Sequence, residues 1–191
     1  MAEPALPDPV APERWTAEQY LRLVDDGVLG PDDKVELLEG VIVSMAPQNT
    51  PHAVGVNLVA DALYRNLTDR AAIRIQLTFI AGSHSVPEPD AAVVAGAARD
   101  YLESHPRTAL LVVEVADSSL RQDRLTKAAM YAAAGIPEYW IVNLPNDCVE
   151  VRRDPAPTER RYRSVTLMRR GDVIELAAIP DARIAAADLL P

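Results

Sequence analysis

Three stretches of the chain carry apolar residues at the three- and four-residue spacing of an amphipathic helix. Each stretch begins at a hydroxyl residue that can cap the first turn, and two of the three end at a glycine. The sequence therefore predicts helices over about 16–26, 50–67 and 119–135, with Thr16, Thr50 and Ser119 as the expected cap residues. It also predicts capping boxes of Thr16 with Gln19 and of Ser119 with Gln122.

Other stretches have the pattern of β-strands. Residues 109–115 form a near-continuous apolar run, which is typical of a central strand covered on both faces. Alternating or β-branched runs predict further strands, and strands that precede, separate and follow the helices predict an α/β fold. We expect a mixed central sheet flanked by helices. The expected strands are a hairpin over 35–45, single strands at 73–80, 91–95, 109–115 and 139–142, a hairpin of 149–153 with 162–168, and a short strand at 173–176.

The first 14 residues contain four prolines and no apolar periodicity. We expect a flexible proline-rich tail there, and a single folded domain over 15–191. The tail lacks the basic start and apolar run of a secretion signal, and the longest apolar stretch, 128–136, is far shorter than the roughly 20 residues of a membrane span. One cysteine, Cys148, allows no intrachain disulfide. Together these features predict a cytoplasmic protein without a membrane segment.

The charge of the chain is acidic overall and uneven along its length. Its net charge is −9, from 19 Lys and Arg against 28 Asp and Glu, which excludes generic coating of nucleic acid by charge. Residues 151–170, here called the arginine stripe, contain seven arginines against two acidic residues. Such a stripe permits a directed contact with nucleic acid, and it is equally compatible with the solvated face of a hairpin. The arginines expected to contact nucleic acid are Arg152, Arg153, Arg160 and Arg161.

Three charged residues lie in surroundings that do not suit them. Glu114 lies inside the apolar run 109–115, where a lone carboxylate is costly unless a cation or a donor compensates it. Asp90 begins the strand expected at 91–95, so two strand-borne carboxylates can meet at one side of the sheet. Two carboxylates with water are the ligands that Mg²⁺ prefers. Lys127, in the third helix, is a candidate for stabilising negative charge on a phosphodiester, or for deprotonating the attacking water.

Each of these residues also has an ordinary explanation. An aspartate after proline, as at Asp90, is typical of a turn. Glu114 is compatible with a strand at the edge of the sheet, or with an arginine partner. Asp123 and Lys127 are four residues apart and have the spacing of a surface salt pair, which contributes roughly 0.2–0.5 kcal/mol. These residues alone therefore leave the metal site open.

The order and spacing of several motifs resemble a large bacterial family of restriction endonucleases within the PD-(D/E)XK nuclease superfamily. The resemblance covers roughly residues 15–178, nearly the whole expected domain. His52 also matches the family, but a local hydrogen bond at a helix start is its ordinary explanation. The matching motifs are Pro89-Asp90, Val113-Glu114-Val115, Asp123 with Lys127, Tyr131 to Trp140, Glu36-Leu-Leu-Glu-Gly40 and Met45-Ala-Pro47.

The resemblance implies a restriction-endonuclease-like fold and Mg²⁺-dependent hydrolysis of phosphodiester bonds in DNA, with Mn²⁺ as a substitute. It implies that Asp90 and Glu114 bind the metal and that Lys127 is the catalytic lysine. It also implies that Glu36 adds an acidic group, which acts through a second metal or a water. A homodimer is expected, because cleavage of both strands needs two sites.

At one position the sequence departs from the superfamily. The usual lysine lies two residues after the glutamate, and this chain has Ala116 there. With the acidic net charge, this departure leaves open a non-catalytic binding or assembly module that retains the nuclease fold. An enzyme acting on RNA or on a nucleic-acid end is a third hypothesis.

Overall fold

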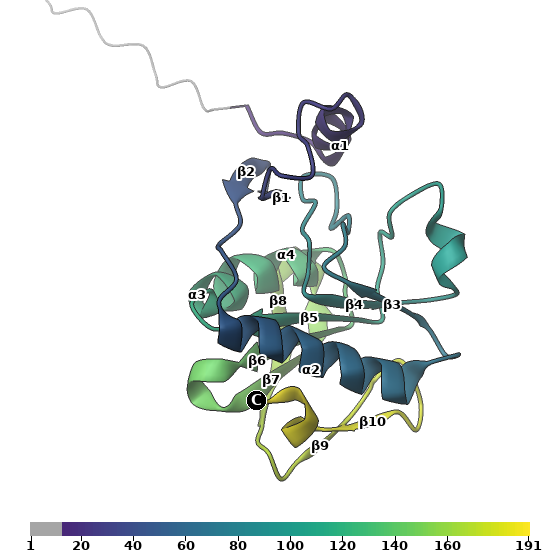
Figure 1. The fold of residues 1–191 in the computed structure, drawn as a ribbon, viewed down its shortest axis with the longest axis vertical. Helices are drawn as coiled ribbons and strands as arrows, with labels where there is room; N and C mark the ends of the chain where they lie inside the picture. Colours follow the sequence, from purple (N-terminus) through teal and green to yellow (C-terminus); the bar gives the residue numbers. More distant parts are fainter. Residues whose placement is uncertain (1–12) are drawn as a thin grey trace, which may run out of the picture.

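The computed structural model describes residues 13–191, so almost all of the expected tail, 1–14, lies outside the described residues. The central sheet is built from β3 (Ala72–Ile75), β4 (Ala91–Val94), β5 (Leu111–Ala116), β6 (Glu138–Asn143), β7 (Cys148–Ala156) and β8 (Arg161–Met168). These six strands are ordered β3-β4-β5-β6-β7-β8 (Figure 1). Neighbours are antiparallel except β5 and β6, which are parallel, so the sheet is mixed, as predicted.

The remaining elements form layers and short connections around this sheet. The helices are α1 (Ala17–Asp25), α2 (Thr50–Leu67), α3 (Leu120–Gln122) and α4 (Ala128–Ala133), with a π-helical turn, η2 (Asp123–Lys127), between α3 and α4. Two small antiparallel hairpins are β1 (Val35–Leu38) with β2 (Val41–Ser44), and β9 (Val173–Glu175) with β10 (Arg183–Ala185). Short 3₁₀ turns are η1 (Ala98–Tyr101), η3 (Leu144–Asn146), η4 (Pro157–Glu159) and η5 (Ala186–Leu189).

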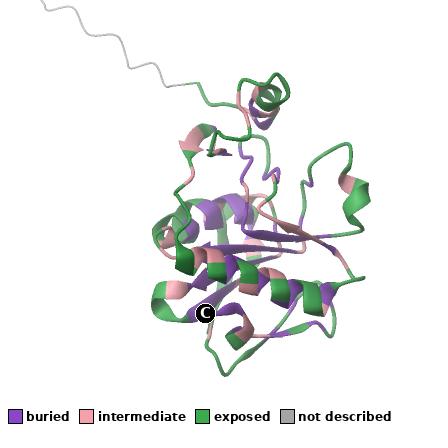
Figure 2. Cartoon of the chain, in the orientation of Figure 1, coloured by how far each residue is buried: buried purple, intermediate pink, exposed green. Residues whose placement is uncertain are grey.

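Helices cover both faces of the central sheet, as the sequence predicts. Helix α2 lies along one face, where its apolar side packs against β4, β5 and β6 and against the β9–β10 segment (Figure 1). Helix α4 packs on the opposite face, where Met130 and Tyr131 are fully buried. The strands β4, β5 and β6 are buried along their whole length (Figure 2), which explains their continuous apolar runs. The predicted α/β fold class is therefore confirmed.

Helix α1 and the β1–β2 hairpin form a third apolar cluster at one end of the molecule (Figure 1). The capping box predicted at Thr16 is present, with the Thr16 hydroxyl accepting a hydrogen bond from the Gln19 amide. Leu37 in β1 is buried in this cluster and bridges to Val86. Side chains alternate along a strand, so the neighbouring Glu36 points the other way, toward β5.

The ends of one strand and two helices differ from the sequence prediction. The strand expected over 73–80 ends at Ile75, because Gln76 adopts a positive φ of 49°. Asn49 rather than Thr50 caps α2, and its side chain accepts a hydrogen bond from the His52 amide. Ser119 makes no capping hydrogen bond to the backbone, contrary to the predicted capping box.

Two further differences concern whole elements. The third helix was expected to be regular, but five of its residues, Asp123–Lys127, form the π turn η2. Strand β10 was not expected at all.

Over the part of the chain that the structure describes, no helix has the length and apolar character needed to cross a bilayer.

Gly55 sets how closely α2 approaches β5. A Cβ at this position would lie 2.7 Å from Val115 Cγ1, inside normal contact distance. We expect Gly55→Ala to destabilise the fold by about 1 kcal/mol, since overpacking costs about 1–3 kcal/mol and alanine regains only about 0.8–1.0 in helix propensity. Urea unfolding measures the difference. Gly171→Ala, where a Cβ meets nothing within 4 Å, is the matched control. Equal midpoints for both variants would contradict this account.

Candidate active site

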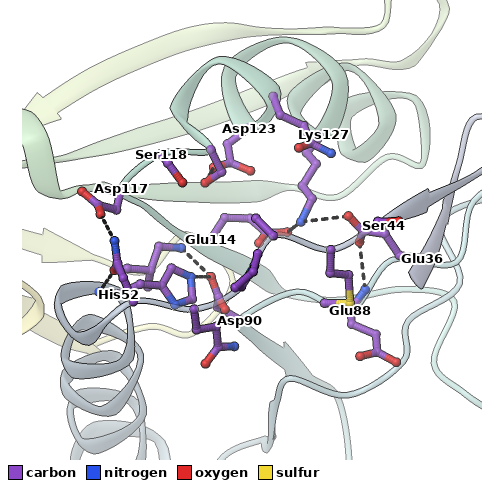
Figure 3. Close-up of a pocket in the computed structure, with 18 residues that line it drawn as sticks. Glu36, Ser44, His52, Glu88, Asp90, Glu114, Asp117, Ser118, Asp123 and Lys127 are labelled. Carbon is purple, nitrogen blue, oxygen red and sulfur yellow. Dashed lines mark hydrogen bonds and ion pairs between the residues drawn. The ribbon is translucent and has the colours of Figure 1, made fainter. Parts of the chain in front are cut away.

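A pocket opens where β4 and β5 meet the start of α2, the β1–β2 hairpin and the π turn η2 (Figure 3). Its lining is strongly acidic, with Lys127 and His52 as the basic side chains. The structure brings together here all four residues predicted to be catalytic. The six carboxylates that line the pocket are Glu36, Glu88, Asp90, Glu114, Asp117 and Asp123.

The register of two strands places Asp90 next to Glu114. In the antiparallel pair β4–β5, Ala91 lies opposite Val113, so the next pair outward is Asp90 with Glu114. The Asp90 carboxylate is held by hydrogen bonds from three residues, His52, Val115 and Gln76. Its Oδ2 accepts from the Val115 amide at 2.8 Å, and its Oδ1 accepts from the Gln76 side chain at 3.1 Å. The left-handed turn at Gln76 that ends β3 therefore also serves the site.

His52 lines the pocket, although the sequence analysis assigned it no chemical role. Its Nε2 lies 3.2 Å from Asp90 Oδ2, and its Nδ1 is enclosed without a partner among the described residues. The hydrogen bond to Asp90 raises the pKa of His52, against the opposing effect of burial. Burial alone would raise the pKa of Asp90, but the contacts with His52, Val115 and Gln76 outweigh it and lower that pKa. Asp90 is therefore held ionised.

Glu114 is only 4% exposed, as its apolar surroundings predict. Its Oε1 accepts hydrogen bonds from Lys127 Nζ at 3.0 Å and from the Tyr131 hydroxyl at 2.8 Å. Oε2 accepts none within residues 13–191. Burial raises the pKa of Glu114 well above its ordinary value, although the Lys127 charge acts against this. The ordinary explanations are wrong here, because β5 lies between β4 and β6 and the cationic partner is a lysine.

Lys127 reaches the pocket from the π turn. Its Nζ lies 3.0 Å from Glu114 Oε1 and 3.7 Å from Glu36 Oε1 (Figure 3). Burial disfavours its charge, but the carboxylates of Glu114, Glu36 and Asp123 outweigh this and raise the pKa of Lys127. A lysine that stays protonated cannot take a proton from water, which favours the electrostatic role over the basic one.

The surface salt pair between Asp123 and Lys127 is not present. Asp123 is 1% exposed and Lys127 is 8% exposed, and the ion pairs of Lys127 are with Glu114 and Glu36. In the π turn the Ala128 amide bonds to the Asp123 carbonyl, five residues back. Such turns insert one extra residue into a helix and are frequent at functional sites. Here two of the three charged side chains of the turn, Asp123 and Lys127, line the pocket.

The arginine stripe does not reach this pocket. Arg152 and Arg153 lie in β7, Arg160 directly follows the turn η4, and Arg161 begins β8. Each of the four already has a carboxylate partner, and a contact with nucleic acid stays a prediction. The ion pairs are Arg152–Glu150 at 2.8 Å, Arg153–Glu138 at 2.7 Å, Arg160–Glu39 at 2.7 Å and Arg161–Glu159 at 2.5 Å.

With this geometry in place, comparison with known proteins identifies the family. The model of the family Uma2, described as "Putative restriction endonuclease", matches residues 17–187. The chain belongs to the Uma2 family. The resemblance drawn from the sequence motifs is thereby confirmed.

A solved structure shares the fold of this Uma2 protein. The crystal structure of a "putative nuclease belonging to DUF820" from Anabaena variabilis ATCC 29413 matches with a TM-score of 0.68. The match covers 91% of this chain and 96% of that chain, at 16% sequence identity, and it confirms the nuclease-like fold alone. No curated protein matches the sequence.

The structure gives a physical reason for the departure at Ala116. Ala116 is fully buried in the apolar cluster under α4, on the same face of β5 as Val112. A lysine there would have to displace core side chains. The Lys127 ammonium, from the helical segment that follows β5, does reach Glu114, and its role as the replacement stays a prediction.

Proposed function

We propose that this Uma2 protein is a divalent-metal-dependent endonuclease that hydrolyses phosphodiester bonds in DNA. Membership of a family described as restriction endonucleases supports a nuclease in general terms. The observation that carries the proposal is the meeting of Asp90 and Glu114 on adjacent strands, with the Lys127 ammonium 3.0 Å from Glu114.

The donor set at the pocket fits a divalent cation. Asp90 is ionised, and Glu114 keeps one oxygen, Oε2, without a hydrogen-bond partner in the described part of the chain. Over the same residues, no group of three His, Cys, Asp or Glu side chains is placed to bind a metal ion without further ligands. Mg²⁺ suits this arrangement, because it takes one or two protein carboxylates and keeps water or substrate phosphate in its other positions. Such an ion would polarise the phosphoryl group and acidify a bound water.

Other residues of the pocket would stabilise charge on the substrate and hold the metal ligands in position. The charged Lys127 is placed to stabilise negative charge that develops on the phosphoryl oxygens. Glu36 lies 3.7 Å from the same ammonium and accepts a hydrogen bond from the Glu88 amide at 3.4 Å, so it would orient Lys127. His52 and the Val115 amide fix the Asp90 carboxylate, as outer partners commonly do for metal ligands.

DNA is the substrate class that the family description supports. Cleavage of both strands of a duplex needs two sites, which a homodimer would supply through a two-fold interface. Within the arginine stripe, Arg160 and Arg161 have half-exposed or exposed side chains and are the better candidates for phosphate contacts. Arg152 is mostly buried.

Calorimetric titration of Mn²⁺ and Mg²⁺ tests the metal site. We expect wild type to bind, and Asp90→Asn and Glu114→Gln to lose metal affinity by at least about tenfold, because each removes a ligand charge. Glu175→Gln, at an exposed surface pair, is the control.

Cleavage of supercoiled plasmid in the presence of Mn²⁺ completes the test. Wild type should nick or linearise the plasmid, and both pocket variants should not. A wild-type protein that neither binds metal nor cleaves DNA would contradict the proposal and favour the non-catalytic module. Cleavage of RNA alone would place the substrate in the other class of nucleic acid.

A further inference from the structure

The buried carboxylates of this protein are of two kinds. Glu138 and Glu150 are almost fully buried, and each accepts hydrogen bonds from arginine, Arg153 and Arg124 respectively. Asp123 is equally buried, at 1% exposure, but it forms no ion pair with any described residue. The Lys127 charge acts on Asp123 without a direct ion pair, but burial outweighs it and raises the pKa of Asp123, so the ionised carboxylate is costly there. Its retention calls for a function, as with other destabilising groups in active sites.

The surroundings of Asp123 leave one of its oxygens free. Oδ2 accepts a hydrogen bond from the Ser119 hydroxyl at 2.6 Å. Oδ1 has no hydrogen-bond partner in the described residues and is not sealed from solvent. In Figure 3 Asp123 projects from the helix on one side of the pocket, and Asp90 and His52 lie on the other side. The free oxygen therefore belongs to the cavity in which the proposed substrate would lie.

Two contacts fix the backbone around Asp123. The Tyr139 hydroxyl donates to the Asp123 carbonyl at 3.2 Å. The next residue, Arg124, donates to Glu150 in β7 through both Nε and a terminal nitrogen, at 2.8 and 2.6 Å. These bonds hold the π turn on the sheet, so the Asp123 side chain is a positioned group rather than a mobile one.

The other groups of the pocket are poor acceptors for a proton from water. The Lys127 ammonium is already paired with Glu114 and Glu36. Both oxygens of Asp90 already accept hydrogen bonds, and Glu114 is a proposed metal ligand that also holds Lys127. The free nitrogen of His52, Nδ1, is enclosed by protein.

Three further acidic side chains line the pocket, and each is engaged or partly exposed. Glu88 is half-buried, and its Oε1 accepts a hydrogen bond from the Thr78 hydroxyl at 3.4 Å. Glu36 pairs with Lys127 and accepts the Glu88 amide, while Asp117 bonds to Asn49 and is partly exposed. Among the buried carboxylates of the pocket in residues 13–191, only Asp123 has an oxygen that makes no hydrogen bond or ion pair and is not assigned to the metal. Burial raises its pKa above that of an ordinary aspartate, which strengthens it as a base.

We infer that Asp123 is a further catalytic residue, which orients the attacking water and accepts its proton. The inference rests on the proposed nuclease function. As the water oxygen forms its bond to phosphorus, one water proton moves to Asp123 Oδ1. The bond from phosphorus to the leaving nucleoside oxygen breaks, and that oxygen takes a proton from solvent. Asp123 then returns its proton to solvent, so atoms and charge balance.

Asp123→Asn tests this role, because asparagine has the same size and can still accept the Ser119 hydrogen bond. We expect single-turnover plasmid cleavage at saturating Mn²⁺ to fall by about 10²–10³-fold at neutral pH, within the usual range for general-base catalysis. Mn²⁺ affinity should be unchanged. The variant's rate should rise more steeply with pH than the wild-type rate, because hydroxide from solvent replaces the missing base. Its melting temperature should rise.

A purely structural role for Asp123 gives a different pattern. It predicts a lower melting temperature, with rate and metal affinity lost together and an unchanged pH profile. Glu138→Gln is the matched control, a buried acid paired with arginine, which should lower the melting temperature and leave cleavage by the folded protein intact. If Asp123→Asn fails to fold, Ser119→Ala provides the second variant, with a smaller rate loss and retained metal affinity.

The outcomes separate this inference from the function on which it rests. Wild-type cleavage with an equal rate for Asp123→Asn overturns the role of Asp123 and leaves the nuclease proposal standing. Absence of cleavage and of metal binding in wild type overturns both.

Discussion

Lys127→Met is expected to slow phosphodiester cleavage by about 10²–10³-fold, the usual effect of removing one preorganised electrostatic donor. Methionine keeps an apolar stem in the same position and removes only the charge and its hydrogen bonds. The ammonium competes for Glu114 Oε1, from which it lies 3.0 Å away. Metal affinity should therefore be equal or higher in the variant while the rate falls. Single-turnover cleavage and Mn²⁺ calorimetry measure the two effects separately.

The control for this experiment is the chain's other lysine, Lys34, which is exposed. Lys34→Met should cleave as wild type does. Equal cleavage by Lys127→Met and wild type would remove Lys127 from the mechanism. Loss of metal affinity in Lys127→Met would show instead that the lysine organises the carboxylates.

Arg153→Met should cost about 3 kcal/mol of unfolding free energy, since breaking a buried ion pair leaves the other charge uncompensated. Glu138 is fully buried, and it accepts hydrogen bonds from Arg153 at 2.7 and 3.0 Å and from Trp140 Nε1 at 2.8 Å. The side chain of Arg153 is 36% exposed, so water partly screens the pair and the effect falls at the low end of the usual range. Urea denaturation provides the measurement.

The double variant Arg153→Met with Glu138→Met distinguishes the cause. When both charges are removed, much of the lost stability should return, because the penalty comes from the unpaired carboxylate. A double variant as unstable as the single one would show that packing of the arginine stem, rather than its charge, is what matters. The same chemistry affects tests of DNA binding, because a loss of binding in Arg153 variants cannot be separated from unfolding.

Much of the fold was predictable because the main elements are specified by local patterns. The alternation and apolar runs of the central strands follow directly from burial on one or both faces. The capping box at Thr16 lies within four residues of sequence. The predicted helix caps were wrong where more than one hydrogen-bond partner was available to the same group. Ser119 bonds to Asp123 rather than to the backbone, and Asn49 caps α2 in place of Thr50.

The sequence predicted the part of the candidate site in which a charged residue lies within a run of apolar residues. A glutamate inside an apolar run had to meet a cation, and Glu114 does so. His52 and Tyr131 were not assigned roles, because their contacts with Asp90 and Glu114 depend on how α2 and α4 pack on the sheet. The π turn left no pattern in the sequence. Its extra residue is fixed by tertiary contacts such as that of Arg124 with Glu150.

The π turn has a consequence for how related sequences are aligned. Each residue along a helix turns the next side chain by about 100°, so the distance along the chain from β5 to Lys127 decides which side chain meets Glu114. The segment from Ser119 to Lys127 is therefore constrained in length more strictly than in composition. A relative with one residue fewer there would keep the same sheet and present a different side chain to the glutamate. In Uma2 sequences the residue that corresponds to Lys127 is best sought at a fixed count beyond the strand, in an alignment without gaps between the strand and that residue.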